Sequence, residues 1–194
     1  MADNGFFILD NLKFLAYHGT TLDKASCIIE SGFEVNPSEE DWLGNGVYFF
    51  VDGFACPKIN AMEWASFKCH GLQPCVVVSE ISVPFEKVLD LRSEKGLHAY
   101  NQERSHFITS NYRGLQTRRD LTKKKRRDIR LDDAIITKGV LSSLGVSVLF
   151  HHLYIKREVH RDLELESSYP KSTVCCVADP TFIIRSWIDY SLAV

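Results

Sequence analysis

The sequence predicts an α+β fold in one domain, and three observations support this class. Apolar, β-branched segments of strand length and amphipathic segments of helical spacing are interspersed along the chain. Their order shows no regular strand–helix–strand repeat, which argues against a doubly wound parallel sheet. A chain of 194 residues with 45% hydrophobic residues can bury one good core. We therefore expect residues 1–194 to form a single domain, with a basic exposed insertion at about residues 109–130.

The first half of the chain predicts three strands and two helices. The first helix follows a threonine N-cap, either Thr20 or Thr21, and ends at Gly32, because glycine is common just past a helix end. The clearest strand is the β-branched run before Pro84. The predicted strands are residues 13–17, 47–51 and 75–83, and the predicted helices are residues 22–31 and 55–68.

The second half predicts two helices and two strands around a polar segment. Residues 94–108 and 131–144 have helical character, and residues 146–155 and 174–177 have strand character. Residues 109–130 are polar with almost no apolar periodicity, which predicts an exposed loop or a marginal helix.

Composition narrows the class of protein. The chain has no run of 18 apolar residues, so we expect no transmembrane helix and no membrane partner. Its N-terminus lacks the basic region of a signal peptide, and its six cysteines include no C-x-x-C pair. We expect a cytoplasmic protein with reduced, mostly buried thiols. Adjacent pairs such as His151-His152 and Cys175-Cys176 cannot easily chelate one ion, so no metal site is expected.

A basic band lies on an otherwise acidic chain. Residues 113–130 hold nine cations against two acids, a net charge of +7, whereas the remainder carries −9. This predicts a surface that binds a polyanion, most favourably RNA. The alternative is a solvated loop or a docking site for an acidic partner. The candidate nucleic-acid-binding residues are Arg118, Arg119, Lys123, Lys124, Lys125, Arg126 and Arg127.

Two short segments carry the most specific pattern. His18 precedes Gly19 at the end of one strand, and Tyr48 follows Gly46 at the start of another. Gly19 lets a ligand amide approach the backbone. Taken singly, His18 is better explained as a core histidine and Tyr48 as an ordinary strand tyrosine. Together they predict one pocket in which His18 bonds a sugar hydroxyl and Tyr48 stacks on a flat ring.

The combined pattern resembles the ADP-ribosyltransferases of the poly(ADP-ribose) polymerase and diphtheria-toxin type. Tyr17-His18-Gly19-Thr20 is similar to the family's His-Gly-Thr/Ser strand, and Gly44-Asn-Gly46-Val-Tyr48-Phe is similar to its Gly-x-Gly-Ile/Val-Tyr-Phe strand. The resemblance spans about residues 13–188. It implies a split antiparallel sheet with flanking helices and NAD as co-substrate. The implied NAD-contacting residues are His18, Gly19, Thr20, Gly46, Tyr48 and Trp64. Helix capping explains Thr20 as well, and a core aromatic explains Trp64.

The chain departs from the family at one position. Five residues before the Asp179 that matches the family's closing motif, where the family has a catalytic glutamate, stands Val174. Three interpretations remain open. In the first, the domain is an inactive binding module. In the second, another carboxylate takes the place of the glutamate. In the third, the acceptor needs little activation because it is already ionised. The candidate substitutes are Glu164 and Glu166, taken as catalytic together with His18 and Tyr48, and after them Glu158 and Glu80.

These observations predict an NAD-dependent ADP-ribosyltransferase that acts on a macromolecule, with RNA the favoured acceptor. Its compactness resembles effectors of toxin–antitoxin and phage-defence systems, some of which modify mRNA, and this implies an antitoxin protein as a partner. The alternatives are an inactive transferase fold that binds RNA or protein, and a transferase that modifies protein.

Overall fold

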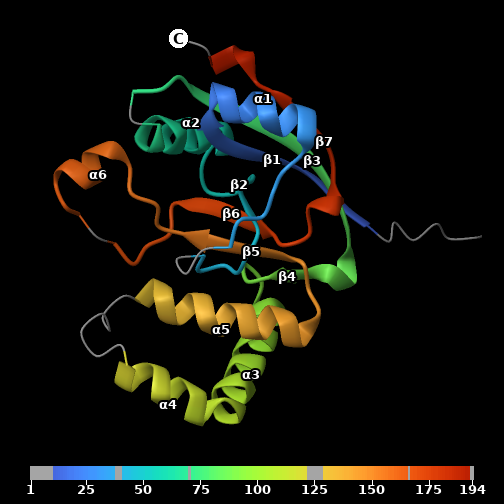
Figure 1. Cartoon of the computed structure of the whole chain (residues 1–194), viewed down its shortest axis with the longest axis vertical. Helices are drawn as coiled ribbons and strands as arrows, with labels where there is room; N and C mark the ends of the chain where they lie inside the picture. Colours follow the sequence, from blue (N-terminus) through green and yellow to red (C-terminus); the bar gives the residue numbers. More distant parts are fainter. Residues whose placement is uncertain (1–10, 38–40, 70, 122–128, 166, 193–194) are drawn as a thin grey trace, which may run out of the picture.

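A computed structural model describes residues 11–37, 41–69, 71–121, 129–165 and 167–192. These residues form a seven-stranded sheet and six α-helices, so the predicted α+β class is confirmed (Figure 1). The strands are β1 (Asn11–Thr21), β2 (Val47–Phe50), β3 (Pro74–Pro84), β4 (Val88–Asp90), β5 (Val148–Leu153), β6 (Ser172–Val177) and β7 (Ile183–Ile188). The helices are α1 (Leu22–Ser31), α2 (Pro57–Lys68), α3 (Glu94–Ser110), α4 (Tyr112–Leu121), α5 (Ile129–Leu144) and α6 (Glu158–Asp162).

The strands follow the order β4-β5-β6-β2-β1-β3-β7 across the sheet. All paired strands are antiparallel except β4 and β5 at one edge, which are parallel, so the sheet is mixed where the resemblance implies an antiparallel core. β1 and β3 pair over eleven positions, whereas β1 and β2 pair only at Tyr17↔Phe50. The centre of the sheet is therefore narrowly joined between β1 and β2, and the two strands part beyond Tyr17.

Both faces of the central strands are buried, which explains their nearly continuous apolar sequence. The face that we call the α2 face carries Phe50, Val174 and Cys176 and packs against helix residues that include Ala61 and Leu141. The opposite face, which we call the Phe49 face, is formed by a second cluster of Ala16, Phe49, Ile81, Phe150 and Cys175. Neighbouring residues of β6 thus point in opposite directions, as the alternation along a strand requires.

Helix α1 begins and ends where the sequence predicts. The Thr21 hydroxyl accepts a hydrogen bond from the Lys24 N–H at 3.3 Å, which makes Thr21 the N-cap. Gly32 ends the helix at φ 83°, a conformation that glycine adopts without strain.

β4, β7 and α6 were not predicted, since each is short or lacks a distinct pattern. Among the described residues, no helix is both long and apolar enough to cross a membrane.

The prediction of mostly buried thiols is confirmed. Cys27 and Cys56 are exposed, whereas Cys69, Cys75, Cys175 and Cys176 are buried and free. Burial raises the pKa of Cys176 to about 12, so its reactive thiolate is scarce at neutral pH.

Under native conditions we expect a disulfide-exchange reagent to label Cys27 and Cys56 rapidly and the other four cysteines only on unfolding. Rapid native labelling of all six cysteines, counted by mass spectrometry, would contradict this packing.

Candidate functional site

His18 lies near the end of β1, where β1 separates from β2. Its Nδ1 lies 2.8 Å from the backbone carbonyl oxygen of Tyr48, and its ring packs edge-on against Phe33 and Phe49 with centroids 5.3 and 5.8 Å away. Burial lowers the pKa of His18, although the hydrogen bond to Tyr48 opposes this shift. A neutral imidazole that donates from Nδ1 leaves Nε2 as an acceptor. His18 is thus oriented by the backbone of the strand that carries Tyr48.

Tyr48 lies on the α2 face, and its hydroxyl is engaged within the loop that leads into β2. The hydroxyl accepts from the Leu43 N–H at 2.9 Å and donates to the Gly44 carbonyl at 2.9 Å. Burial raises the pKa of the phenol. The side chain therefore stabilises the entry loop of β2, which restricts its freedom to stack on a ligand.

The predicted single pocket lined by both rings needs correction. The His18 ring belongs to the Phe49 face and the Tyr48 ring to the α2 face, so the two side chains point to opposite sides of the sheet. They meet only through the Nδ1–carbonyl hydrogen bond. A ligand that contacts both rings has to occupy the gap where β1 and β2 part, since strand alternation prevents both rings from facing the same side.

The two glycines have packing roles in this structure. A Cβ on Gly19 would lie 1.9 Å from the carbonyl oxygen of Ala61, so α2 fills the space over Gly19 that was predicted for a ligand. A Cβ on Gly46 would lie 2.6 Å from the carbonyl oxygen of Val177 in β6. Thr20 is paired with Cys75 and does not cap α1, so capping does not account for it.

Val174 occupies a buried position between β2 and β5. Its side chain is 4% exposed, and its register partners are Phe50 on one side and His151 on the other. Paired residues share a face, so all three lie on the α2 face, where Tyr48 and Trp64 also pack. The Nδ1 atom of His151 is buried and has no hydrogen-bond partner among the described residues. Burial lowers the pKa of His151 and keeps its ring neutral near pH 7.

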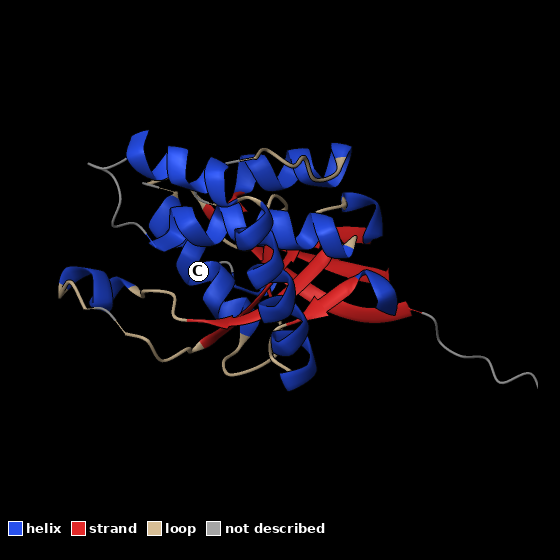
Figure 2. Ribbon diagram, turned by 90° about the horizontal axis from the view of Figure 1, so that it is seen from below, coloured by secondary structure: helices blue, strands red, loops and turns tan. Residues whose placement is uncertain are grey.

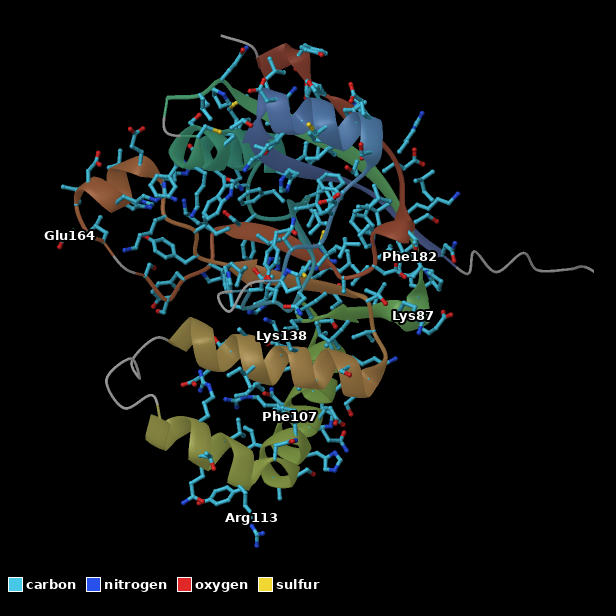
Figure 3. All side chains as sticks on the ribbon, in the orientation of Figure 1. Lys87, Phe107, Arg113, Lys138, Glu164 and Phe182 are labelled. Atoms are coloured by element: carbon cyan, nitrogen blue, oxygen red, sulfur yellow. The ribbon has the colours of Figure 1, made fainter. Side chains whose placement is uncertain are left out.

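The carboxylates predicted to replace the missing glutamate are not gathered around Val174. Glu164 is exposed at φ 51° in the loop after α6, and Figure 3 shows it at the outer end of that loop, pointing away from the sheet. Glu80 is paired with Arg185, with 2.7 Å between Oε2 and Nε. Glu158 lies beside a cavity between α2 and α6, and Glu166 lies outside the described residues. Glu164 as a catalytic carboxylate is therefore not supported by this geometry.

Two polar residues of α2, Asn60 and Glu63, precede the predicted Trp64 and were not predicted as site residues. Asn60, Glu63 and Trp64 line a small cavity together with Phe50, the register neighbour of Val174. With Phe67 they occupy helix positions i, i+3, i+4 and i+7, which place them on one side of the helix. This spacing was the available signal, since a carboxylate and an amide there interrupt an otherwise apolar stripe. Glu63 is the carboxylate that lines this cavity with Phe50, and its Oε2 pairs with Arg157 Nε at 3.1 Å.

The basic segment is helical where it is described. Arg118 lies in α4, and its guanidinium pairs with Asp132 at 2.6 Å. Arg113 is exposed on the same helix and points away from the rest of the molecule in Figure 3. Arg119 belongs to α4, and its side chain lies outside the described part of the structure. The other candidates, Lys123, Lys124, Lys125, Arg126 and Arg127, lie outside the described residues.

Comparisons with protein-family models, curated proteins and solved structures find no match to this chain.

Proposed function

We propose that this chain is an NAD-dependent ADP-ribosyltransferase that acts on a macromolecular acceptor. One observation carries the proposal: the two segments that resemble the family's strands lie on β1 and β2, and the position that corresponds to the family's glutamate lies on β6, and these three strands are adjacent in the sheet although they are far apart in sequence. The hydrogen bond from His18 to the carbonyl of Tyr48 supports it, because it ties the two motifs together at the point where β1 and β2 part.

In this proposal the nicotinamide riboside lies at the gap between β1 and β2. His18 presents Nε2 as an acceptor for a ribose hydroxyl, and Tyr48 acts as a positioning residue through its backbone carbonyl. The bond between the ribose carbon C1′ and the nicotinamide nitrogen breaks, and nicotinamide leaves as a neutral molecule. The acceptor oxygen then bonds to C1′. Orientation of the ribose and stabilisation of its developing positive charge are the protein's contributions.

In this proposal Glu63 is the base that takes the proton from a hydroxyl acceptor. It is a carboxylate on the α2 face, and it lines the same small cavity as Phe50, whose strand neighbour is Val174. A general base within reach contributes about 10²–10⁴ in rate. An acceptor that is already ionised, such as a phosphate, needs no such base.

RNA remains the proposed acceptor, because the basic residues around α4 form the chain's main concentration of positive charge. A toxin-like role with an antitoxin partner, in the cytoplasm, belongs to the same proposal.

A second candidate, a binding module without catalysis, is favoured by two observations. Position 174 is a buried valine, and the Tyr48 hydroxyl is satisfied by the chain itself.

The test is incubation of the protein with NAD labelled in the adenylate, in separate reactions with total RNA, DNA and lysate protein. Label transferred to RNA supports the proposal. Label found on protein or DNA instead would show that RNA is not the acceptor and would identify the true one. If no acceptor is labelled and free nicotinamide does not form, the chain is the binding module.

His18→Phe is expected to reduce nicotinamide release at least tenfold. The phenyl ring retains the packing against Phe33 and Phe49, but it removes the acceptor atom and the bond to Tyr48. Loss of that hydrogen bond lowers stability by only about 0.5–1.5 kcal/mol. Nicotinamide release and a thermal melt are measured on the same sample. Unchanged release with an unchanged melt would remove His18 from the reaction.

A further inference from the structure

A cavity of about 610 Å³ lies between α2 and α6. Its volume is within the range of about 300–1,000 Å³ that is typical of small-molecule sites. α2 forms one wall, and α6 forms the other as part of the connection between β5 and β6, which projects from the body of the molecule in Figure 2.

The cavity wall exposes apolar side chains. Ile59 and Phe67 on α2 are 49% and 39% exposed, and Val159 on α6 is 64% exposed. The guanidinium of Arg161 lies 3.4 Å from the centre of the Phe67 ring. Exposed apolar surface inside a concavity is typical of a binding site, and one flanked by a stacked cation suits a planar ring.

One end of this site is rich in hydrogen-bond donors. The small cavity lined by Asn60, Lys171 and Ser172 adjoins the large one, because Glu63 lines both, and its volume of about 10 Å³ admits one water-sized group such as a single ligand oxygen. Asn60 is 5% exposed, and its Nδ2 donor has no partner among the described residues. A buried donor without a partner costs about 1–3 kcal/mol, so a ligand acceptor at this point would be stabilised.

Positive charge is crowded around the same end. Arg157 and Lys171 line the two cavities near Glu63, Arg161 lies on the Phe67 ring, and the carboxylates beside the large cavity are Glu63 and Glu158. The pKa of Lys171 is lowered by burial first and then by the charge of Arg157, while Glu63 opposes the shift. Cations that repel one another in a partly buried site gain from an added anion.

We propose that the large cavity binds a nucleotide. The base lies against Ile59 and the Arg161–Phe67 stack, and the phosphate lies at Arg157 and Lys171 with one oxygen directed into the small cavity beside Asn60. The proposal rests on the two cavities and not on NAD cleavage. Of the residues implied by the family resemblance, only Trp64 lines either cavity.

The test measures the binding of 5′-AMP to the full chain by calorimetry, with no NAD present. We expect 5′-AMP to bind more tightly than adenosine or inorganic phosphate, because each of those lacks one half of the contacts. Arg157→Gln and Asn60→Leu are each expected to weaken 5′-AMP binding roughly ten- to hundredfold.

Arg185→Gln is the matched control, since Arg185 pairs with Glu80 on the β3–β7 edge as Arg157 pairs with Glu63. It is expected to leave 5′-AMP affinity unchanged, and thermal melts show whether each variant is folded. Should Asn60→Leu fail to fold, the surface variant Arg157→Gln decides alone. Absence of 5′-AMP binding, or binding that Arg157→Gln does not weaken, overturns the proposal. Binding of 5′-AMP without any NAD cleavage upholds it and counts only against the transferase.

Discussion

Gly19→Ala is expected to lower the stability of the protein by about 3 kcal/mol, the upper part of the usual range for overpacking. The added Cβ would lie 1.9 Å from the carbonyl oxygen and 2.8 Å from the carbonyl carbon of Ala61. Both are backbone atoms of α2, so no side-chain rotation relieves the contact and the helix itself has to move. For a chain of this size the loss corresponds to a fall in Tm of roughly 6–12 °C, measurable by calorimetry.

Gly114→Ala is the matched control. Gly114 lies in α4, and a Cβ added there would have no neighbouring atom within 4 Å, so alanine should be neutral or slightly stabilising through its helix propensity. If Gly19→Ala melts like the wild type, α2 does not pack against the end of β1. The result also matters for function. A loss of activity in Gly19→Ala would reflect displacement of α2 and would not by itself demonstrate a ligand contact at Gly19.

Much of the fold was predictable because local signals agree with the tertiary structure. Helix α1 has a threonine cap and a terminal glycine, and the β-branched run of β3 is largely buried and pairs with β1 on one side and β7 on the other. β7 was not predicted because its residues are only partly buried at a sheet edge, so their pattern is weak. The sequence does not distinguish a helix from a loop over α4, because its surface is polar and its apolar residues do not form a stripe.

The candidate site was predicted less well, for a physical reason. The sequence places His18 at the end of one strand and Tyr48 at the start of another, but it does not show the register that turns their side chains to opposite faces of the sheet. A shift of one residue in pairing would have brought both rings to one side. Glu63 was not predicted because only the tertiary structure places it beside β2 and the β5–β6 connection. The residues that line its cavity are more than 100 positions apart in the sequence.

Glu63→Gln is expected to reduce ADP-ribosyl transfer to a hydroxyl acceptor by about 10²–10⁴, the usual contribution of a general base. The amide has nearly the shape of the carboxylate but cannot take up the proton. The pair with Arg157 is at the surface and contributes about 0–1 kcal/mol, so the variant should remain folded. Transfer of labelled ADP-ribose and the melting temperature are measured together.

Glu80→Gln provides the matched control. Glu80 is also paired with an arginine, Arg185, but it lies on β3 and lines neither cavity. Equal losses in the two variants would indicate a general effect of breaking an ion pair. Full activity in Glu63→Gln would mean that the acceptor is already ionised or that the base lies elsewhere.

Val174→Glu completes this prediction, because it introduces the glutamate that the resembled family has at the corresponding position. Val174 is 4% exposed between Phe50 and His151, so a carboxylate there would be desolvated and would be driven toward its protonated form. We therefore expect little gain in transfer from Val174→Glu, even in the Glu63→Gln background, together with a lower Tm. Substantial rescue of Glu63→Gln by Val174→Glu would show that position 174 reaches the reacting atoms after all. It would move the proton acceptor from α2 to β6, where the family resemblance implies it.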